Sequence, residues 1–236
     1  MPKYNRILLK LSGEALSKGA DGILNFDFIA EVAASVRRCA EEGVKIAVVV
    51  GGGNIWRGKT GTQISRTRSD HIGMLATVIN SLALATGFEN AGLSVKVMTA
   101  IPMQQIAEPY VRDRAMEYLD EGKIVIVACG SGNPFFSTDT AAILRAVELC
   151  ADAALFAKNI DAVYTADPKK DPTAKKIDHI SYDDILKNDL AVIDSTAAAM
   201  GRENDLSLLL FGLNDPENIP RIVNGEKLGT IVSNER

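Results

Sequence analysis

The chain has 236 residues, of which 47% are hydrophobic and 24% are charged, so it is not a disordered, collagen-like or coiled-coil protein. It is long enough for one large domain or two small ones. Its 26 Lys and Arg residues stand against 30 Asp and Glu residues, for a net charge of −4. That balance leaves no excess of cations to bind a phosphate backbone, so we expect no nucleic-acid partner.

Three cysteines without a CxxC spacing, Cys39, Cys129 and Cys150, favour a reducing compartment, and we expect them to be small core residues. The N-terminal segment lacks the apolar core of a signal peptide. The longest apolar runs, such as residues 46–50, are too short to cross a bilayer. We therefore expect a soluble, cytoplasmic protein with no membrane partner.

Hydrophobic periodicity predicts alternating strands and helices along the whole chain. Strands are predicted at residues 6–12, 44–50, 94–99, 123–129, 153–157, 206–211 and 228–232. Helices are predicted from residue 28 to 40, after Asp70, at 104–119, 138–150, 182–187 and 195–202, and before Gly225, while 165–176 is predicted to be an exposed loop. This alternation is typical of a three-layer α/β/α sandwich with a mostly parallel central sheet.

Ligands of such sheets bind at the carboxyl ends of the strands, and three strand ends here carry unusual residues. The first is Lys10, which precedes a turn at Ser12 and Gly13. A lysine in an apolar strand needs a carboxylate or a phosphate, because an unpaired buried ammonium is costly. The alternative is a side chain that extends to solvent, but the turn at the same sheet edge favours a lysine that faces phosphate.

The second strand end is the segment Gly51-Gly52-Gly53-Asn54, with Arg57 shortly after it. Consecutive glycines let backbone N–H groups converge on an anion, and arginine adds a bidentate phosphate donor. A plain flexible turn is the alternative interpretation. Neither GxxxxGK[ST] nor a GxGxxG that opens a helix is present, so a P-loop ATPase and a common dinucleotide dehydrogenase are both disfavoured.

The third strand end is the segment 130–139, with the sequence GSGNPFFSTD. Ser137 and Thr138 can cap the following helix, whose N-terminus attracts anions, and Asp139 would lie in its first turn. Phe135 and Phe136 offer flat apolar surface on which a base could stack. The equally acceptable alternative is a capped helix with two core phenylalanines.

Other polar residues could complete a site. Asp70 is either the N-cap of the long helix or an acceptor for sugar hydroxyls. Asp161 and Asp194 each end a short apolar stretch and could accept hydrogen bonds from amide or ammonium groups. Tyr164 and Asp167 lie at the mouth of the exposed loop, where an adenine could be held.

Five motifs occur in sequence order: LLKLSGEAL at 8–16, GGGNIWRG at 51–58, DHIGMLATVIN at 70–80, GNPFFSTDTAAILRA at 132–146 and DAVYTADP at 161–168. In these motifs the chain resembles the amino acid kinase superfamily, and within it the bacterial UMP kinases, from residue 6 to the C-terminus. Two departures are small. Ala162 stands where a glycine is common, and Lys158-Asn159 occupies a variable position of the nucleotide pocket.

The resemblance implies one domain over residues 1–236, with a UMP-binding side at about 1–130 and an ATP-binding side at about 131–236. It implies transfer of the γ-phosphoryl group of ATP to UMP, which gives ADP and UDP, in pyrimidine nucleotide (CTP) biosynthesis. The residues it marks as catalytic are Lys10, Asp139 and Asp194. Those it marks for ATP are Lys10, Leu11, Ser12, Gly13, Gly53, Arg57, Asn159, Tyr164 and Asp167. Those it marks for UMP are Gly52, Asp70, Ser131, Gly132, Asn133, Pro134, Phe135, Phe136, Ser137 and Thr138.

The resemblance further implies that Mg²⁺ arrives with ATP, held mostly by phosphates and not by a metal site of the protein. It implies a homohexamer built from dimers, with GTP as activator, UTP as inhibitor and the long helix after Asp70 as a dimer surface. Two alternatives remain: a phosphotransferase of the same superfamily with another acceptor, and a non-catalytic nucleotide-binding regulator on the same fold.

Overall fold

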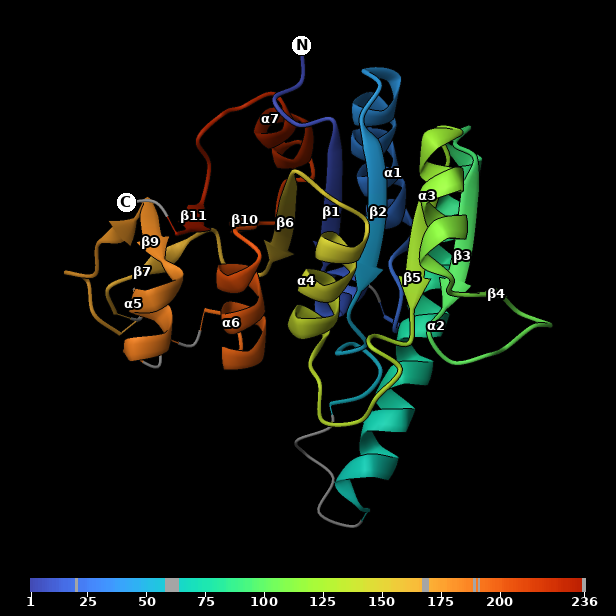
Figure 1. Ribbon diagram of the computed structural model, residues 1–236, viewed down its shortest axis with the longest axis horizontal. Coiled ribbons are helices and arrows are strands. Elements are labelled where there is room, and N and C mark those ends of the chain that lie inside the picture. The colour runs from blue at the N-terminus through green and yellow to red at the C-terminus, as the bar shows by residue number, and fades with distance from the viewer. Residues whose placement is uncertain (20, 58–63, 167–169, 189, 191, 235–236) are drawn as a thin grey trace.

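Figure 1 shows the computed structural model, which describes residues 1–236 except 20, 58–63, 167–169, 189, 191 and 235–236. The strands are β1 (Arg6–Leu11), β2 (Lys45–Val50), β3 (Val95–Thr99), β4 (Glu108–Pro109), β5 (Ile124–Ala128), β6 (Ala153–Lys158), β7 (Val163–Tyr164), β8 (Lys176–Ile177), β9 (His179–Ser181), β10 (Ser207–Gly212) and β11 (Thr230–Ser233). The helices are the 3₁₀ turn η1 (Gly13–Ser17), α1 (Phe26–Glu41), α2 (Arg66–Asn90), α3 (Arg112–Asp120), α4 (Thr138–Glu148), α5 (Tyr182–Lys187), α6 (Ser195–Glu203) and α7 (Asn218–Val223).

In the part of the chain that the structure describes, nine strands form one sheet in the order β4-β3-β5-β2-β1-β6-β10-β11-β9. Neighbours from β4 to β10 pair in parallel, and β11 pairs antiparallel with β10. The arrows of β2, β5 and β6 point to the lower edge of the sheet in Figure 1, and α2 begins below that edge. The expected mostly parallel sheet is confirmed, and its carboxyl edge gathers the loops after β1, β2, β5 and β6.

Helices cover both faces of this sheet. Leu9 and Leu11 of β1 belong to one fully buried core, which α1, α2 and α7 close. Leu8, one residue away, belongs to the opposite core, which α3, α4, α5 and α6 close. Successive side chains of a strand point to opposite faces, so a central strand of this kind must be apolar at nearly every position. The three-layer α/β/α sandwich is therefore confirmed, and Lys10 is the exception on the face that α4 covers.

Two expectations about local structure are wrong, and three short strands were not predicted. The helix predicted at 104–119 begins only at Arg112, because Glu108–Pro109 forms the edge strand β4 beside β3. Proline lacks the N–H that an inner strand would have to donate, so an edge strand can accommodate it. Cys150 is exposed, although Cys39 and Cys129 are buried as expected. The short strands β7, β8 and β9 give no periodic signal and were not expected.

Helix α2 is long and apolar enough by composition to cross a membrane, although no such segment was expected from the sequence. Most of its apolar stretch is buried within the protein, against α1, β2, β3 and β5. It therefore behaves as a core helix. Its outer side nevertheless exposes Leu75, Ile79 and Leu82, so its apolar side chains are only partly buried.

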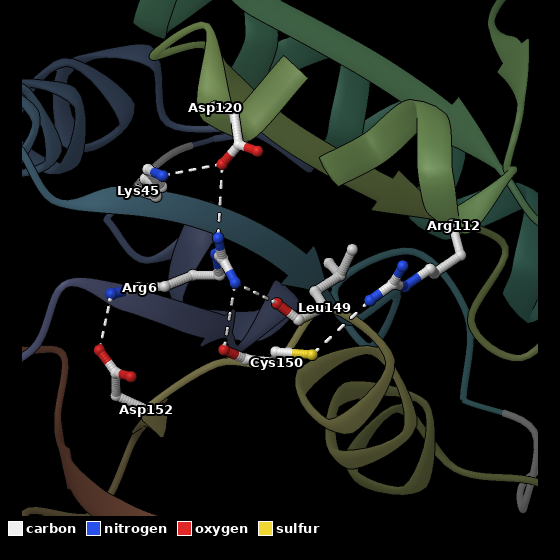
Figure 2. A network of polar contacts seen from close by, with 7 residues as sticks. All are labelled: Arg6, Lys45, Arg112, Asp120, Leu149, Cys150 and Asp152. Atoms are coloured by element: carbon white, nitrogen blue, oxygen red, sulfur yellow. Dashed lines mark hydrogen bonds and ion pairs between the residues drawn. The ribbon is translucent and has the colours of Figure 1, made fainter. Parts of the chain in front are cut away.

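A network of polar contacts ties the elements together at the amino edge of the sheet (Figure 2). Arg6 donates to the Leu149 carbonyl at 3.1 Å and pairs with Asp120 at 3.4 Å. Asp120 also pairs with Lys45 at 2.7 Å, and Asp152 accepts the Arg6 backbone N–H at 2.9 Å. This network fixes the start of β1, β2 and β6 relative to α3 and α4. The loops that form the candidate site lie at the opposite, carboxyl edge of the sheet.

Candidate active site

Two lysines from neighbouring strands meet one carboxylate at the carboxyl edge of the sheet. Lys10 of β1 is paired in register with Phe156 of β6, so Lys158 lies two residues further along β6 on the same face. Asp139, in the first turn of α4, lies between the two ammonium groups. Its Oδ1 is 2.9 Å from Lys10 Nζ, and its Oδ2 is 3.0 Å from Lys158 Nζ. The side chains are 10, 16 and 18% exposed for Lys10, Asp139 and Lys158, so the three charges form a buried group.

Burial and neighbouring charges shift the pKa values of Asp139 and Lys158 in opposite directions. Burial by itself raises the pKa of the Asp139 carboxyl, but the two ammonium groups outweigh it and hold that pKa below its ordinary value. Burial lowers the pKa of Lys158, and Asp139 counteracts only part of this effect. Asp139 is therefore ionised at neutral pH and lies between the two lysine side chains.

The N-terminus of α4 points at the same place. Ser137 caps the helix by accepting the Thr140 N–H at 3.0 Å. Asp194, which caps α6 by accepting the Ala197 N–H, also accepts the Thr140 hydroxyl at 2.8 Å and the Ser137 hydroxyl. Asp194 thus joins the starts of α4 and α6 and does not contact Lys10 directly. The leading N–H groups of α4 and the helix dipole add positive potential beside Lys10.

The loops after β1 and β2 touch each other at glycines. A Cβ atom on Gly13 would lie 2.2 Å from the Gly51 carbonyl oxygen, and one on Gly52 would lie 2.8 Å from Ala76 of α2. Asn80 of α2 holds this contact by donating to the Gly51 carbonyl at 2.7 Å. Gly13 and Gly52 are therefore required by close approach of neighbouring atoms, which places the β1 loop, the β2 loop and α2 against one another.

The first cavity, of about 270 Å³, lies between the loop after β2, α2 and the loop after β5. Asp70 projects from the first turns of α2 into its wall, where it pairs with Arg66 at 2.9 Å and accepts the Phe135 N–H at 2.8 Å. Ser65 is the N-cap of α2, so the interpretation of Asp70 as N-cap is wrong. Phe136 lines the cavity and is half exposed, while Phe135 is 66% exposed, so neither is a core phenylalanine.

The loop between β5 and α4 has an unusual backbone. Four of its residues have positive φ angles: Cys129 at 65°, Gly130 at 57°, Gly132 at 79° and Phe135 at 73°. Thr77 of α2 anchors its start by accepting the Cys129 N–H at 2.9 Å. The loop forms the cavity wall with residues that the sequence marked as a set: Ser131, Asn133, Ser137 and Thr138, joined by Gly130. Pro134 lies in the same loop and is half-buried, and Gly132 packs against Ala100.

A second cavity, of about 600 Å³, lies on the other side of Gly53 and Arg57, which line both cavities. Glu14 forms its floor, paired with Arg57 at 2.6 Å and accepting from Asn159 at 3.0 Å. Leu11 is buried, and the Ser12 N–H donates to the Ala157 carbonyl at 3.1 Å. This cavity therefore opens where β1, β2 and β6 end.

The remaining expected residues are less informative. Tyr164 donates to Asp161 at 3.0 Å, and that hydrogen bond raises the pKa of the phenol. Asp167 and Gly58 lie outside the described residues. The sequence placed Lys158 in the nucleotide pocket but did not predict its pairing with Asp139, because it does not say that β6 neighbours β1. Glu14 was not predicted as a site residue.

The order of the strands, the buried Lys10 and the glycine loops together define a class of protein. Comparison with known protein families identifies that class. The sequence pattern of the Amino acid kinase family matches residues 5–212, so the chain belongs to this family.

Solved structures similar to the whole chain are more specific. UMP kinase from Bacillus anthracis is 37% identical with a TM-score of 0.95, over 100% of this chain and 98% of that one. UMP kinase from Ureaplasma parvum is 32% identical with a TM-score of 0.92, over 98% and 99%. Uridylate kinase from Archaeoglobus fulgidus is 30% identical with a TM-score of 0.76, over 99% and 100%. Within its family, this chain is thus similar over its full length to UMP kinases.

Proposed function

We propose that the protein is a UMP kinase, an enzyme that transfers the γ-phosphoryl group of ATP to UMP and releases ADP and UDP. The observation that carries the proposal is the group of Lys10, Asp139 and the α4 N-terminus at the carboxyl edge of the sheet, beside two cavities that share Gly53 and Arg57. Full-length similarity to three UMP kinases supports the choice of acceptor.

The two cavities fit two nucleotides that meet at their phosphates. The smaller one, lined by Asp70 and Phe136, would take UMP, with the Asp70 carboxylate available to sugar hydroxyls and Phe136 to the base. The larger one, which Asn159 lines, would take ATP. The loop after β2, α2 and the loop after β5 would thus hold the acceptor, and the donor would lie between the loops after β1 and β2 and the segment after β6.

The chemistry asks for position and charge more than for a covalent catalyst. A phosphate acceptor is already ionised, so no histidine or other strong base is needed. Lys10 and the α4 N–H groups would stabilise the charge that spreads over the phosphoryl oxygens during transfer. Asp139 and Asp194 would act on these donors: Asp139 directly on Lys10, and Asp194 through the α4 N-terminus.

The residues present fit a metal ion that enters bound to the nucleotide. Among the described residues, no cluster of three or more His, Cys, Asp or Glu side chains could hold a metal. Phosphate oxygens of ATP would therefore supply most of the ligands to the Mg²⁺ ion, and the ion would neutralise part of the phosphate charge. Asp139 is already engaged by two lysines.

The test is an assay of ADP release from Mg-ATP with UMP, dUMP, CMP, carbamate and a carboxylate acceptor, each added separately. We expect ADP release that requires UMP, and UDP as product. Release with another acceptor but not UMP would identify a different phosphotransferase of the family. Nucleotide binding without release with any acceptor would identify a regulator and refute the proposal.

We also propose assembly into homo-oligomers, up to a hexamer, and a cytoplasmic role in pyrimidine nucleotide synthesis with GTP and UTP as effectors. The exposed Leu75, Ile79 and Leu82 on one side of α2 support an interface between copies, since apolar side chains gathered on a surface favour association. The test is a sedimentation experiment that compares the mass in solution of the wild type with that of the L75E/L82E variant. A wild-type monomer would refute the assembly.

A further inference from the structure

We infer that Lys158 is a positioning residue for the proposed phosphoryl transfer: it holds Asp139 and the segment before α6, and thereby fixes Lys10. This inference rests on the proposed function. The sequence resemblance gave Lys158 no role and placed it at a variable position.

The geometry of the Asp139 carboxylate carries the inference. Each oxygen faces one ammonium group, Oδ1 towards Lys10 and Oδ2 towards Lys158, at nearly equal distances of 2.9 and 3.0 Å. A carboxylate bound at both oxygens to cations on two different strands cannot rotate about its Cβ–Cγ bond without breaking one pair. Without Lys158, Asp139 could turn both oxygens to Lys10 and draw its ammonium back toward α4.

Lys158 has a second contact that extends its effect to Asp194. Its ammonium donates to the Val192 carbonyl at 2.6 Å, two residues before Asp194. Asp194 in turn accepts the Thr140 hydroxyl of α4 at 2.8 Å. One side chain at the end of β6 therefore links the first turn of α4 with the segment that enters α6.

The charges around Asp139 come from every element packed against it. Lys10 faces it from β1 and Lys158 from β6, while Asp194 faces Lys158 from the segment before α6. Both lysines lower the pKa of the Asp139 carboxyl against the effect of burial. Removal of Lys158 leaves burial in place and removes one of two stabilising cations, so the Asp139 pKa must rise in that variant.

Lys158→Met tests the inference because methionine keeps the length of the side chain and removes the charge. We expect kcat to fall by about 10- to 100-fold, the scale for misplacing a catalytic group by about 1 Å, with the KM of ATP and of UMP changed less than about 3-fold. We also expect the ratio of variant kcat to wild-type kcat to fall further as pH is lowered, since loss of Lys158 raises the Asp139 pKa and the variant's carboxylate is therefore protonated at a higher pH than that of the wild type. Protonation of the substrates is common to both enzymes and cancels in the ratio.

Lys187→Met is the matched control, because Lys187 is an exposed lysine whose ion pair is with Asp183 of its own helix α5. Lys158→Gln, which keeps a hydrogen-bond donor, serves if the methionine variant does not fold. A kcat close to wild type in folded Lys158→Met overturns the inference, as does a Lys158→Gln variant with both a wild-type kcat and a wild-type pKa of the Asp139 carboxyl. A reduced kcat whose ratio to wild type does not change with pH also overturns it, since that is the result of a purely structural role.

The two proposals fail in different ways. If the wild type does not form UDP, the proposed function fails, whereas ¹³C NMR titration of the Asp139 carboxyl still measures its coupling to Lys158. A carboxyl pKa that is the same in the wild type and in Lys158→Met overturns the inference even in an active enzyme.

Discussion

Gly13→Ala is the sharpest test of how the site is built. The added Cβ would lie 2.2 Å from the Gly51 carbonyl oxygen, 2.7 Å from the Gly51 carbonyl carbon and 2.9 Å from Asn54 Oδ1. Cβ contacts shorter than 3.0 Å are essentially never observed, so the loops after β1 and β2 must separate by about 0.8 Å. These atoms are mostly backbone and cannot move aside as a flexible side chain would.

This displacement predicts two effects. Overpacking a tight contact costs about 1–3 kcal/mol of unfolding free energy. A shift approaching 1 Å between Lys10 and the phosphate loops costs up to about 100-fold in kcat. The assays are urea denaturation and steady-state release of ADP with saturating UMP.

Gly22→Ala is the matched control, because a Cβ atom there meets nothing within 4 Å. We expect this control to keep the stability and kcat of the wild type. If Gly13→Ala has a kcat within about 2-fold of Gly22→Ala, the contact between the two loops does not position the site, and the reasoning from backbone approach is wrong.

Three further predictions concern single side chains. Lys10→Ala should lower kcat by at least about 100-fold, the effect of losing one preorganised donor, and unchanged steady-state kinetics would remove Lys10 from the mechanism. Tyr182→Phe should lower the unfolding free energy in urea by about 1–2 kcal/mol without altering kcat, since the buried phenol donates to the Leu206 carbonyl at 2.8 Å. The Asp139 pKa is lower folded than unfolded, so the stabilisation it provides is present above about pH 4 and is lost as pH falls through the folded pKa. The stability difference between the wild type and Asp139→Asn should therefore be constant near neutrality and shrink in strong acid, and a difference that grows in acid would contradict this sign.

The inner strands could be predicted from the sequence because each is apolar at consecutive positions. Such runs fit few structures other than a strand that is covered on both faces of a sheet. The predicted bounds agree with the observed ones to within one or two residues for β1, β2, β5, β6 and β10. The edge of the sheet was not predictable in this way. Glu108–Pro109 pairs with β3 through its backbone, and a two-residue strand has no periodicity to detect.

The site was predictable where its chemistry is local and was missed where it is not. Lys10 is conspicuous as a charge in an apolar strand, and Ser137 to Asp139 show a helix start within the sequence itself. The pairing of Lys158 with Asp139 depends on β6 lying beside β1, which only the fold decides. The N-cap was one of two interpretations of Asp70, and the true N-cap, Ser65, was not predicted because it lies in a polar stretch without periodicity.

The positive φ angles at Cys129, Gly130, Gly132 and Phe135 constrain how this enzyme could be redesigned. Branched side chains introduced at these positions would strain the main chain before they met any nucleotide. An altered preference for the accepted base is more accessible from the opposite wall, where Gly73 and Met74 line the same cavity from a regular helix. Libraries that vary these helical positions and leave the strained loop intact should yield more folded variants than the reverse choice.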